Sequence, residues 1–328
     1  MSQTKGRVTI PTNLDVVPET IELMKRWGAD AIRDCDGTEF PEELTKTGAK
    51  IYATYYTTRK DNEWAKANPD EVQQCYVMTA FYTAVDKELS IPLMKGISDE
   101  LMKVNTRDDI KRWWEVIDRS TGEIVPTTNW NYQEETGCVV ICDAVPFHEY
   151  TVSFLARIEW HPVQIYNYLT NGWTCPKQKM YDPAYSATAE YVLDRLNQWC
   201  KEHPETNVVR FTTFLYQFML IYNEDGKEKY VDWFGYGMAA SPALMEAFAK
   251  EYGYRLRAED FVDGGCYNNP FRVPSKRFLD YMQFIEKQVS QKVARYTKIV
   301  HSYGKEAMMF LGDDWIGAEP YGEYFADI

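Results

Sequence analysis

Short apolar runs alternate along the chain with longer amphipathic segments, a pattern typical of strands followed by helices. Apolar residues recur at helical spacing in three segments, 19–27, 191–199 and 276–301. A further helix is predicted over 163–169, after the apolar run 151–160. Strand-like apolar runs cover 29–32, 51–57, 151–160, 208–214 and 306–311. This alternation predicts an α/β fold. No low-complexity linker interrupts it, so we predict one barrel-like domain over 1–328.

One segment departs from the alternation and indicates an insertion. Residues 113–145 contain two hairpin-type turns, 118–123 and 134–137, between β-rich runs. We therefore expect an antiparallel excursion of roughly 113–145 within a TIM-type (β/α)₈ barrel. A closed barrel needs eight βα units and we count about six, so the barrel is expected to be incomplete at its C-terminus.

Two helix-end signals occur in the later part of the chain, one at the start of a helix and one at the end of another. Ser241 followed by Pro242 is an N-cap with proline at the first helical position. Gly304 is placed to end the long segment 276–301. These signals predict two well-bounded helices between the last strands.

Net charge and cysteine content narrow the class of protein. The formal charge is −13, with 49 acidic against 36 basic residues, which argues against binding to nucleic acid or to an anionic membrane surface. Any anion site must then be local and built from a few arginines. The seven cysteines show no metal-type CxxC spacing. With no apolar signal core and no run of transmembrane length, we expect reduced thiols in a cytoplasmic protein.

Several catalytic motifs are absent from the sequence. His148 and Glu149 begin an HExxH zinc motif, but position 152 is valine. No GxGxxG, GxxxxGK[ST] or GxSxG sequence occurs. The sequence therefore gives no support for a zinc hydrolase, for the nucleotide-binding folds that those motifs mark, or for a Ser/His catalytic triad.

Charged residues at the ends of apolar runs are the candidates for chemistry. The run 307–311 stops at Gly312 and is followed by Asp313, Asp314 and Trp315. Barrel enzymes present catalytic groups at the carboxyl ends of strands, and an acid beside an aromatic suits proton donation to a glycosidic oxygen. The spacing by itself favours an acidic turn after a buried strand, because Asp and Gly are ordinary turn residues.

Two arginines carry a different ambiguity. Arg210 lies inside the apolar run 208–214, where a guanidinium is costly unless it meets an anion. Its partner is either a buried carboxylate or a bound oxyanion held by the guanidinium fork. Arg33, at the end of the run 29–32, allows the same two interpretations.

These segments jointly resemble glycoside hydrolase family 112, the inverting phosphorylases of β-galactosides. The matching stretches are WGADAIR (27–33) with DGT (36–38), NEW (62–64), WEVIDR (114–119), HEYTVSFL (148–155), VVRFTTF (208–214), VDWFG (231–235), EDFVDGG (259–265), and GKEAMMFLGDDW (304–315) with EPY (319–321). They cover essentially the whole chain. The family fold is a TIM barrel followed by further domains, in chains roughly twice as long as this one. The resemblance therefore implies the N-terminal catalytic barrel, with the family's C-terminal domains absent.

The resemblance also implies a reaction and a set of site residues. Phosphate attacks the anomeric carbon with inversion, converting a β-galactosyl disaccharide to α-D-galactose 1-phosphate and the acceptor sugar. Asp313 matches the general acid, and Arg33 and Arg210 match phosphate-contacting positions. Positions that match or adjoin sugar contacts are Val163, Asn167, Gln217 and Trp233. No metal or organic cofactor is implied, and a homodimer is the usual assembly of relatives.

Three alternatives remain open at this point. The acceptor can be an N-acetylhexosamine, as in lacto-N-biose or galacto-N-biose, or the L-rhamnose of a β-1,4-galactosyl disaccharide. A glycosidase using water would need a second carboxylate, for which Glu159 or Glu319 can be offered. A truncated barrel that only binds sugar would show no turnover.

Overall fold

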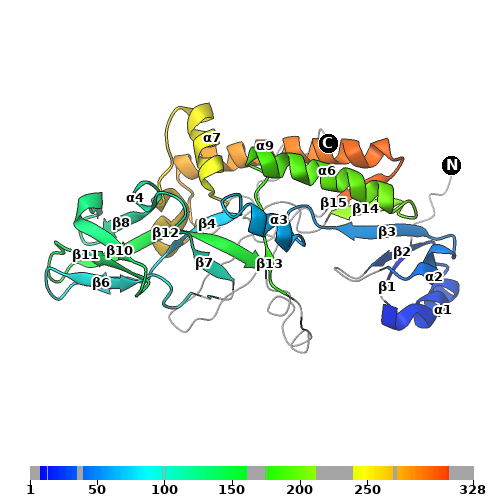
Figure 1. Ribbon diagram of the computed structural model, residues 1–328, viewed down its shortest axis with the longest axis horizontal. Helices are drawn as coiled ribbons and strands as arrows, with labels where there is room; N and C mark the ends of the chain where they lie inside the picture. Colours follow the sequence, from blue (N-terminus) through cyan, green and yellow to red (C-terminus); the bar gives the residue numbers. More distant parts are fainter. Residues whose placement is uncertain are drawn as a thin grey trace.

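The computed structural model describes residues 8–12, 14–34, 40–97, 99, 101–160, 174, 176–211, 239–268 and 272–309. Within them a parallel sheet and a set of antiparallel strands occupy opposite ends of the molecule (Figure 1). Two long helices, α6 (Ser186–Glu202) and α9 (Lys276–Ser302), lie together along the parallel sheet. Among the described residues, no helix is both long and apolar enough to cross a membrane.

The parallel sheet has five strands, which follow one another in space as they do along the chain. They are β1 (Thr9–Thr12), β2 (Ala31–Asp34), β3 (Lys50–Tyr55), β14 (Val208–Phe211) and β15 (Glu306–Met309). The order β1-β2-β3-β14-β15 never reverses, and every pairing is parallel. A doubly wound sheet changes direction at a switch point, whereas a (β/α)₈ barrel winds in one sense. The described strands therefore follow the barrel order.

The long described helices pack against one face of this sheet, together with the short helix near its first strands. Ile10, Ile32 and Ile51 lie in register on β1, β2 and β3 and pack against α1 (Val17–Trp27) and α2 (Glu42–Thr45) through Met24 and Leu44. Further along the same face, strand and helix side chains form the largest core cluster. It includes Tyr55, Val209 and Phe211 with Leu196 of α6 and Val293 and Tyr296 of α9. The opposite face is the one that a barrel turns inward.

The antiparallel strands extend over a wider range than the predicted 113–145. They are β4 (Gln74–Met78), β5 (Tyr82–Thr83), β6 (Leu89–Pro92), β7 (Met102–Val104), β8 (Glu115–Asp118), β9 (Glu123–Ile124), β10 (Trp130–Gln133), β11 (Cys138–Ile141), β12 (Glu149–Trp160) and β13 (Gln178–Lys179). The long strand β12 pairs with β4, β5, β7, β8 and β13. Since β4, β5 and β7 are short and their partner lies far along the chain, local alternation gave no hairpin signal for them.

The predicted helix ends are confirmed where the structure describes them. Ser241 caps α7 (Pro242–Tyr252), and its hydroxyl accepts from the Leu244 amide at 3.4 Å. Gly304 adopts φ 68° after α9. The shorter helices are α3 (Asn62–Ala67), α4 (Ile110–Trp113) and α8 (Glu259–Val262), with 3₁₀ turns η1 (Leu14–Val16), η2 (Thr127–Asn129) and η5 (Asp263–Gly265). The helix expected after 160 lies outside the described residues.

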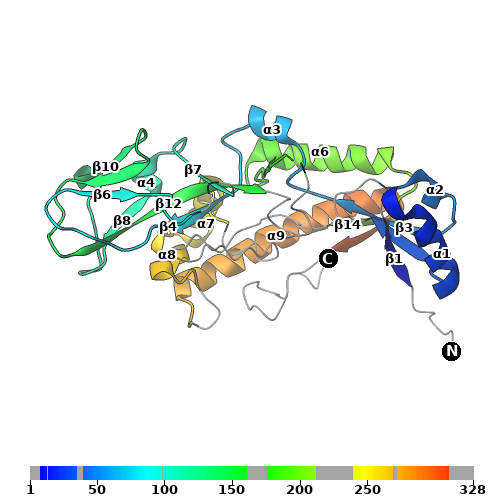
Figure 2. The same ribbon diagram turned by 90° about the horizontal axis from the view of Figure 1, so that it is seen from below.

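One core cluster joins the two ends of the molecule. Tyr76 of β4 and Leu155 of β12 belong to the same buried cluster as Val209 of the parallel sheet and Tyr281 of α9. Helix α9 extends from beside α8 and β4 to the strands at the other end (Figure 2). The antiparallel strands are therefore packed onto the barrel-type part rather than tethered to it.

Candidate functional site

The two arginines singled out from the sequence line one pocket on the face of the parallel sheet opposite the helices. The pocket has a volume of about 270 Å³ and is lined by Thr9, Arg33, Tyr52, Arg210 and Met308. Arg33 lies in register with Tyr52 on β3, and Arg210 lies in register with Met308 on β15. Because in-register residues of parallel strands point to the same face, each of the five strands delivers one side chain to this pocket.

A chain of hydrogen bonds holds Arg210 at the carboxyl ends of these strands. Its Nη1 donates to the Thr54 hydroxyl at 2.9 Å. That hydroxyl lies 2.5 Å from Oδ1 of Asp34, and the Thr54 amide donates to Oδ2 at 2.9 Å. Arg33 joins the group through Nη1, which donates to the Asp34 carbonyl at 3.2 Å. Asp34 and Arg210 are each only 5% exposed.

This arrangement suits an oxyanion. Two guanidinium groups present fixed donor forks, which match the oxygens of phosphate or a carboxylate. The sheltered site screens their charge less than bulk water does, so a local cationic site can exist in a chain of net charge −13. The shared pocket favours the anion-clamp interpretation of Arg33 and Arg210, while Tyr52 and Met308 provide a partly apolar wall.

The other predicted site residues lie outside the described part of the chain. These are Asp313, Val163, Asn167, Gln217 and Trp233, and the alternative carboxylate Glu319 joins them. Asp313 follows the carboxyl end of β15 closely in sequence. Glu159 is described: it belongs to β12, its amide donates to the Leu101 carbonyl at 2.8 Å, and it does not line the arginine pocket.

Sequence reasoning did not identify Tyr52 and Thr54 as site residues. Both alternate along β3 with the buried Ile51 and Ala53. The two-residue period of a strand could therefore have predicted that Tyr52 and Thr54 lie on the same face. That this face is also the face of Arg210 depends on the pairing of β3 with β14, which the sequence did not specify.

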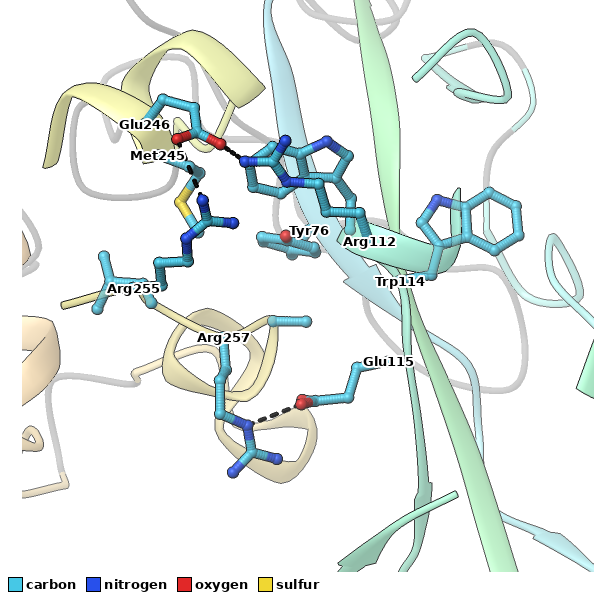
Figure 3. Close-up of a pocket in the computed structure, with 11 residues that line it drawn as sticks. Tyr76, Arg112, Trp114, Glu115, Met245, Glu246, Arg255 and Arg257 are labelled. Atoms are coloured by element: carbon cyan, nitrogen blue, oxygen red, sulfur yellow. Dashed lines mark hydrogen bonds and ion pairs between the residues drawn. The ribbon is translucent and has the colours of Figure 1, made fainter. Parts of the chain in front are cut away.

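A second cavity of about 110 Å³ lies between the antiparallel strands, helix α7 and the segment 255–258 that leads into α8 (Figure 3). Glu246 contacts Arg112 and, at 3.7 Å, Arg255. Arg257 donates through Nε to Glu115 at 2.7 Å. Each carboxylate at this cavity is thus matched by an arginine across the junction, so we assign it to packing between the two parts.

No group of three or more His, Cys, Asp or Glu side chains within the described ranges is arranged to hold a metal ion. The histidine of the incomplete zinc motif is instead paired with a carboxylate. His148 Nδ1 lies 2.6 Å from Oδ2 of Asp118, at the junction of β8 and β12.

Comparison with known proteins identifies the family. The model of the lacto-N-biose phosphorylase N-terminal TIM barrel domain matches residues 6–328. Two 1,3-beta-galactosyl-N-acetylhexosamine phosphorylases of Lachnoclostridium phytofermentans are 56% and 54% identical, each over 98% of this chain and 45% of the relative. A D-galactosyl-beta-1->4-L-rhamnose phosphorylase of the same organism is 39% identical over 98% of this chain and 45% of its own.

The chain thus spans less than half the length of these relatives. Its match nevertheless covers almost every residue, including both arginines of the pocket and the five strands of the parallel sheet. The expected resemblance to the β-galactoside phosphorylases and the expected TIM-barrel class are confirmed: the chain belongs to the lacto-N-biose phosphorylase family, in the region of its N-terminal TIM barrel domain.

Proposed function

We propose that this chain provides the phosphate-binding part of an inverting β-galactoside phosphorylase. The reaction is phosphorolysis of a galactosyl disaccharide of the lacto-N-biose or galacto-N-biose type to α-D-galactose 1-phosphate and the N-acetylhexosamine. The observation that carries the proposal is the convergence of Arg33 and Arg210 on one pocket of a barrel-type sheet. The names of the two most similar relatives described above support the same reaction class.

The arrangement suits a mechanism with phosphate as the nucleophile. A phosphate oxygen attacks the anomeric carbon from the face opposite the leaving sugar, and the bond from that carbon to the glycosidic oxygen breaks. The two arginines offset the charge of phosphate and hold it in line. Since phosphate supplies the nucleophile, one protein carboxyl suffices, and we assign it to Asp313, which gives its proton to the departing oxygen.

The remaining assignments belong to the same proposal. Val163, Asn167, Gln217 and Trp233 would surround the sugar, as their family motifs imply. The chemistry requires neither a metal ion nor an organic cofactor, because acid catalysis and charge neutralisation come from side chains. We further propose a cytoplasmic homodimer, in keeping with the cysteine usage described above and the resemblance.

Turnover with defined disaccharides tests the proposal. Lacto-N-biose, galacto-N-biose and galactosyl-rhamnose are each incubated with and without inorganic phosphate, and α-galactose 1-phosphate is measured. Phosphate-dependent product that disappears in Asp313→Asn is the expected result. Free galactose formed without phosphate would instead indicate a glycosidase that uses water. A folded chain that binds phosphate but gives no product would assign the missing groups to a part of the relatives outside the region matched by this chain.

Galactosyl-rhamnose phosphorolysis is the second candidate function. It is favoured by the relative named for that reaction, at 39% identity. The two candidates share the phosphate pocket and differ in the acceptor, so product from one disaccharide only distinguishes them.

A further inference from the structure

We propose that Thr54 is a positioning residue for phosphate, acting as the neutral middle member of a hydrogen-bond relay from Asp34 to Arg210. The inference rests on the proposed function, since it concerns the same pocket. Thr54 does not line that pocket, so its influence would pass through the guanidinium of Arg210.

The fold places the three residues in a row across adjacent strands. Thr54 lies opposite Arg210 in the pairing of β3 with β14, although the two are 156 residues apart in sequence. Asp34 ends the neighbouring strand β2 and accepts from both the amide and the hydroxyl of Thr54. Backbone register therefore brings the three side chains within reach of one another.

The donor and acceptor inventory gives the relay a direction. A hydroxyl has one proton to donate, whereas a guanidinium donates only and a carboxylate accepts only. The Thr54 proton must consequently lie toward Asp34, at 2.5 Å, and an oxygen lone pair must face Nη1 of Arg210, at 2.9 Å. Rotation of the hydroxyl would break one of the two bonds, so Arg210 is held in one orientation.

The hydroxyl also separates two charges. A carboxylate in direct contact with a guanidinium offsets much of the positive charge that a bound anion needs. Asp34 instead orients Arg210 through the neutral hydroxyl of Thr54, so the carboxylate does not contact the guanidinium through this bond. Pre-orienting a buried, rotamer-rich side chain removes an ordering cost from ligand binding. The expected consequence is tighter phosphate binding than an unsupported arginine would give.

Removal of the hydroxyl leaves the core of the sheet in place. Thr54 is half-buried on the face opposite the helices, whereas its neighbours Ala53 and Tyr55 are buried on the helix-covered face. Valine keeps the branched shape and suits a strand. Thr54→Val therefore tests the hydroxyl rather than the fold, and Thr54→Ser restores it.

The experiment measures the affinity of the chain for inorganic phosphate by titration calorimetry, with urea unfolding of every variant. Thr54→Val should weaken binding about tenfold, the loss expected for one hydrogen bond to a charged group. Thr54→Ser should bind like the unmodified chain. The matched control is Thr12→Val, which removes a buried hydroxyl from β1 that contacts Thr20 at 2.8 Å, and it should leave phosphate affinity unchanged.

A second variant tests the direction of the relay. Asp34→Asn keeps the size of the side chain but replaces one acceptor oxygen by an NH2 group, which only donates. Because the amide and the hydroxyl of Thr54 reach different oxygens of Asp34, one of these two donors then faces another donor. We expect weaker phosphate binding although position 54 is unchanged. In an active form of the enzyme, both variants should raise KM for phosphate and leave KM for the disaccharide unaltered.

The outcomes separate the relay from the proposed function. Equal phosphate affinity in Thr54→Val and the unmodified chain would overturn the relay and leave the arginine pocket intact. If the unmodified chain bound no phosphate, or if Arg210→Gln bound it equally well, the proposed phosphate site would fail and the relay with it. If Thr54→Val did not fold, normal binding by Asp34→Asn would overturn the relay, and tenfold weaker binding would support it.

Discussion

The bidentate pair between Arg119 and Glu259 ties the antiparallel strands to helix α8, and breaking it should destabilise the fold. Arg119 donates through Nη1 and Nη2 to the two carboxylate oxygens at 2.8 and 2.7 Å. Its Nε donates to the Thr151 hydroxyl at 2.8 Å. The perturbation is Glu259→Gln, which removes the negative charge and one acceptor while keeping the length of the side chain.

The magnitude follows from the burial of the two side chains, which are 13% and 28% exposed. Breaking a fully buried pair costs about 3–5 kcal/mol, and breaking an exposed one costs about 0–1 kcal/mol. Partial burial with bidentate geometry places this pair between those limits, so the expected loss is about 2 kcal/mol. The charge on Arg119 then remains, with the Thr151 hydroxyl but without its carboxylate.

The assay is urea unfolding followed by tryptophan fluorescence, comparing midpoints at equal slope. The matched control is Glu63→Gln, which breaks the Lys66 pair whose side chains are 58% and 84% exposed and should change stability by less than about 0.5 kcal/mol. A double-mutant cycle with Arg119→Met should give a coupling energy of about 1–2 kcal/mol. Equal effects of the two glutamine variants, or additivity in the cycle, would refute the reasoning.

Three other perturbations test separate parts of the structure. Arg210→Lys keeps the charge but loses the planar fork, so phosphate should bind about tenfold more weakly by calorimetry; unchanged affinity would contradict the clamp. Burial raises the pKa of the Cys75 thiol to about 12, so mass spectrometry should find it unalkylated at pH 8 while the exposed Cys142 reacts; comparable labelling would contradict that burial. The pKa of Asp61 lies below its ordinary value. Burial acts to raise this pKa, but the hydrogen bond from the Trp64 amide contributes to a larger lowering. The stabilisation by Asp61 is therefore present above the ordinary pKa and is lost as pH falls through the folded-state pKa. Asp61→Ala should lower the free energy of unfolding by about 1 kcal/mol in urea at pH 7 and by less near pH 3. An equal loss at both pH values would contradict this.

Local sequence signals predicted the later helices and the long strand well. α9 (Lys276–Ser302) and β12 (Glu149–Trp160) match their predicted ranges closely, because long periodic segments bury one continuous stripe or face. β1 (Thr9–Thr12), with a proline in four residues, gave no such signal. β4, β5 and β7 were missed because they are short and pair with the distant strand β12, so the antiparallel part was predicted over too narrow a range.

The sequence by itself determined the alternation of strands and helices, the helix ends and, through the resemblance, which arginines to examine. It did not determine that Arg33 and Arg210 share a pocket. That depends on β14 lying beside β3, across the antiparallel strands that separate them in sequence. Periodicity encodes which face of a strand is buried, but hydrogen bonds between parallel strands join distant segments. Only the tertiary structure therefore placed Thr54 between Asp34 and Arg210 and gave the pocket its hydrogen-bonded support.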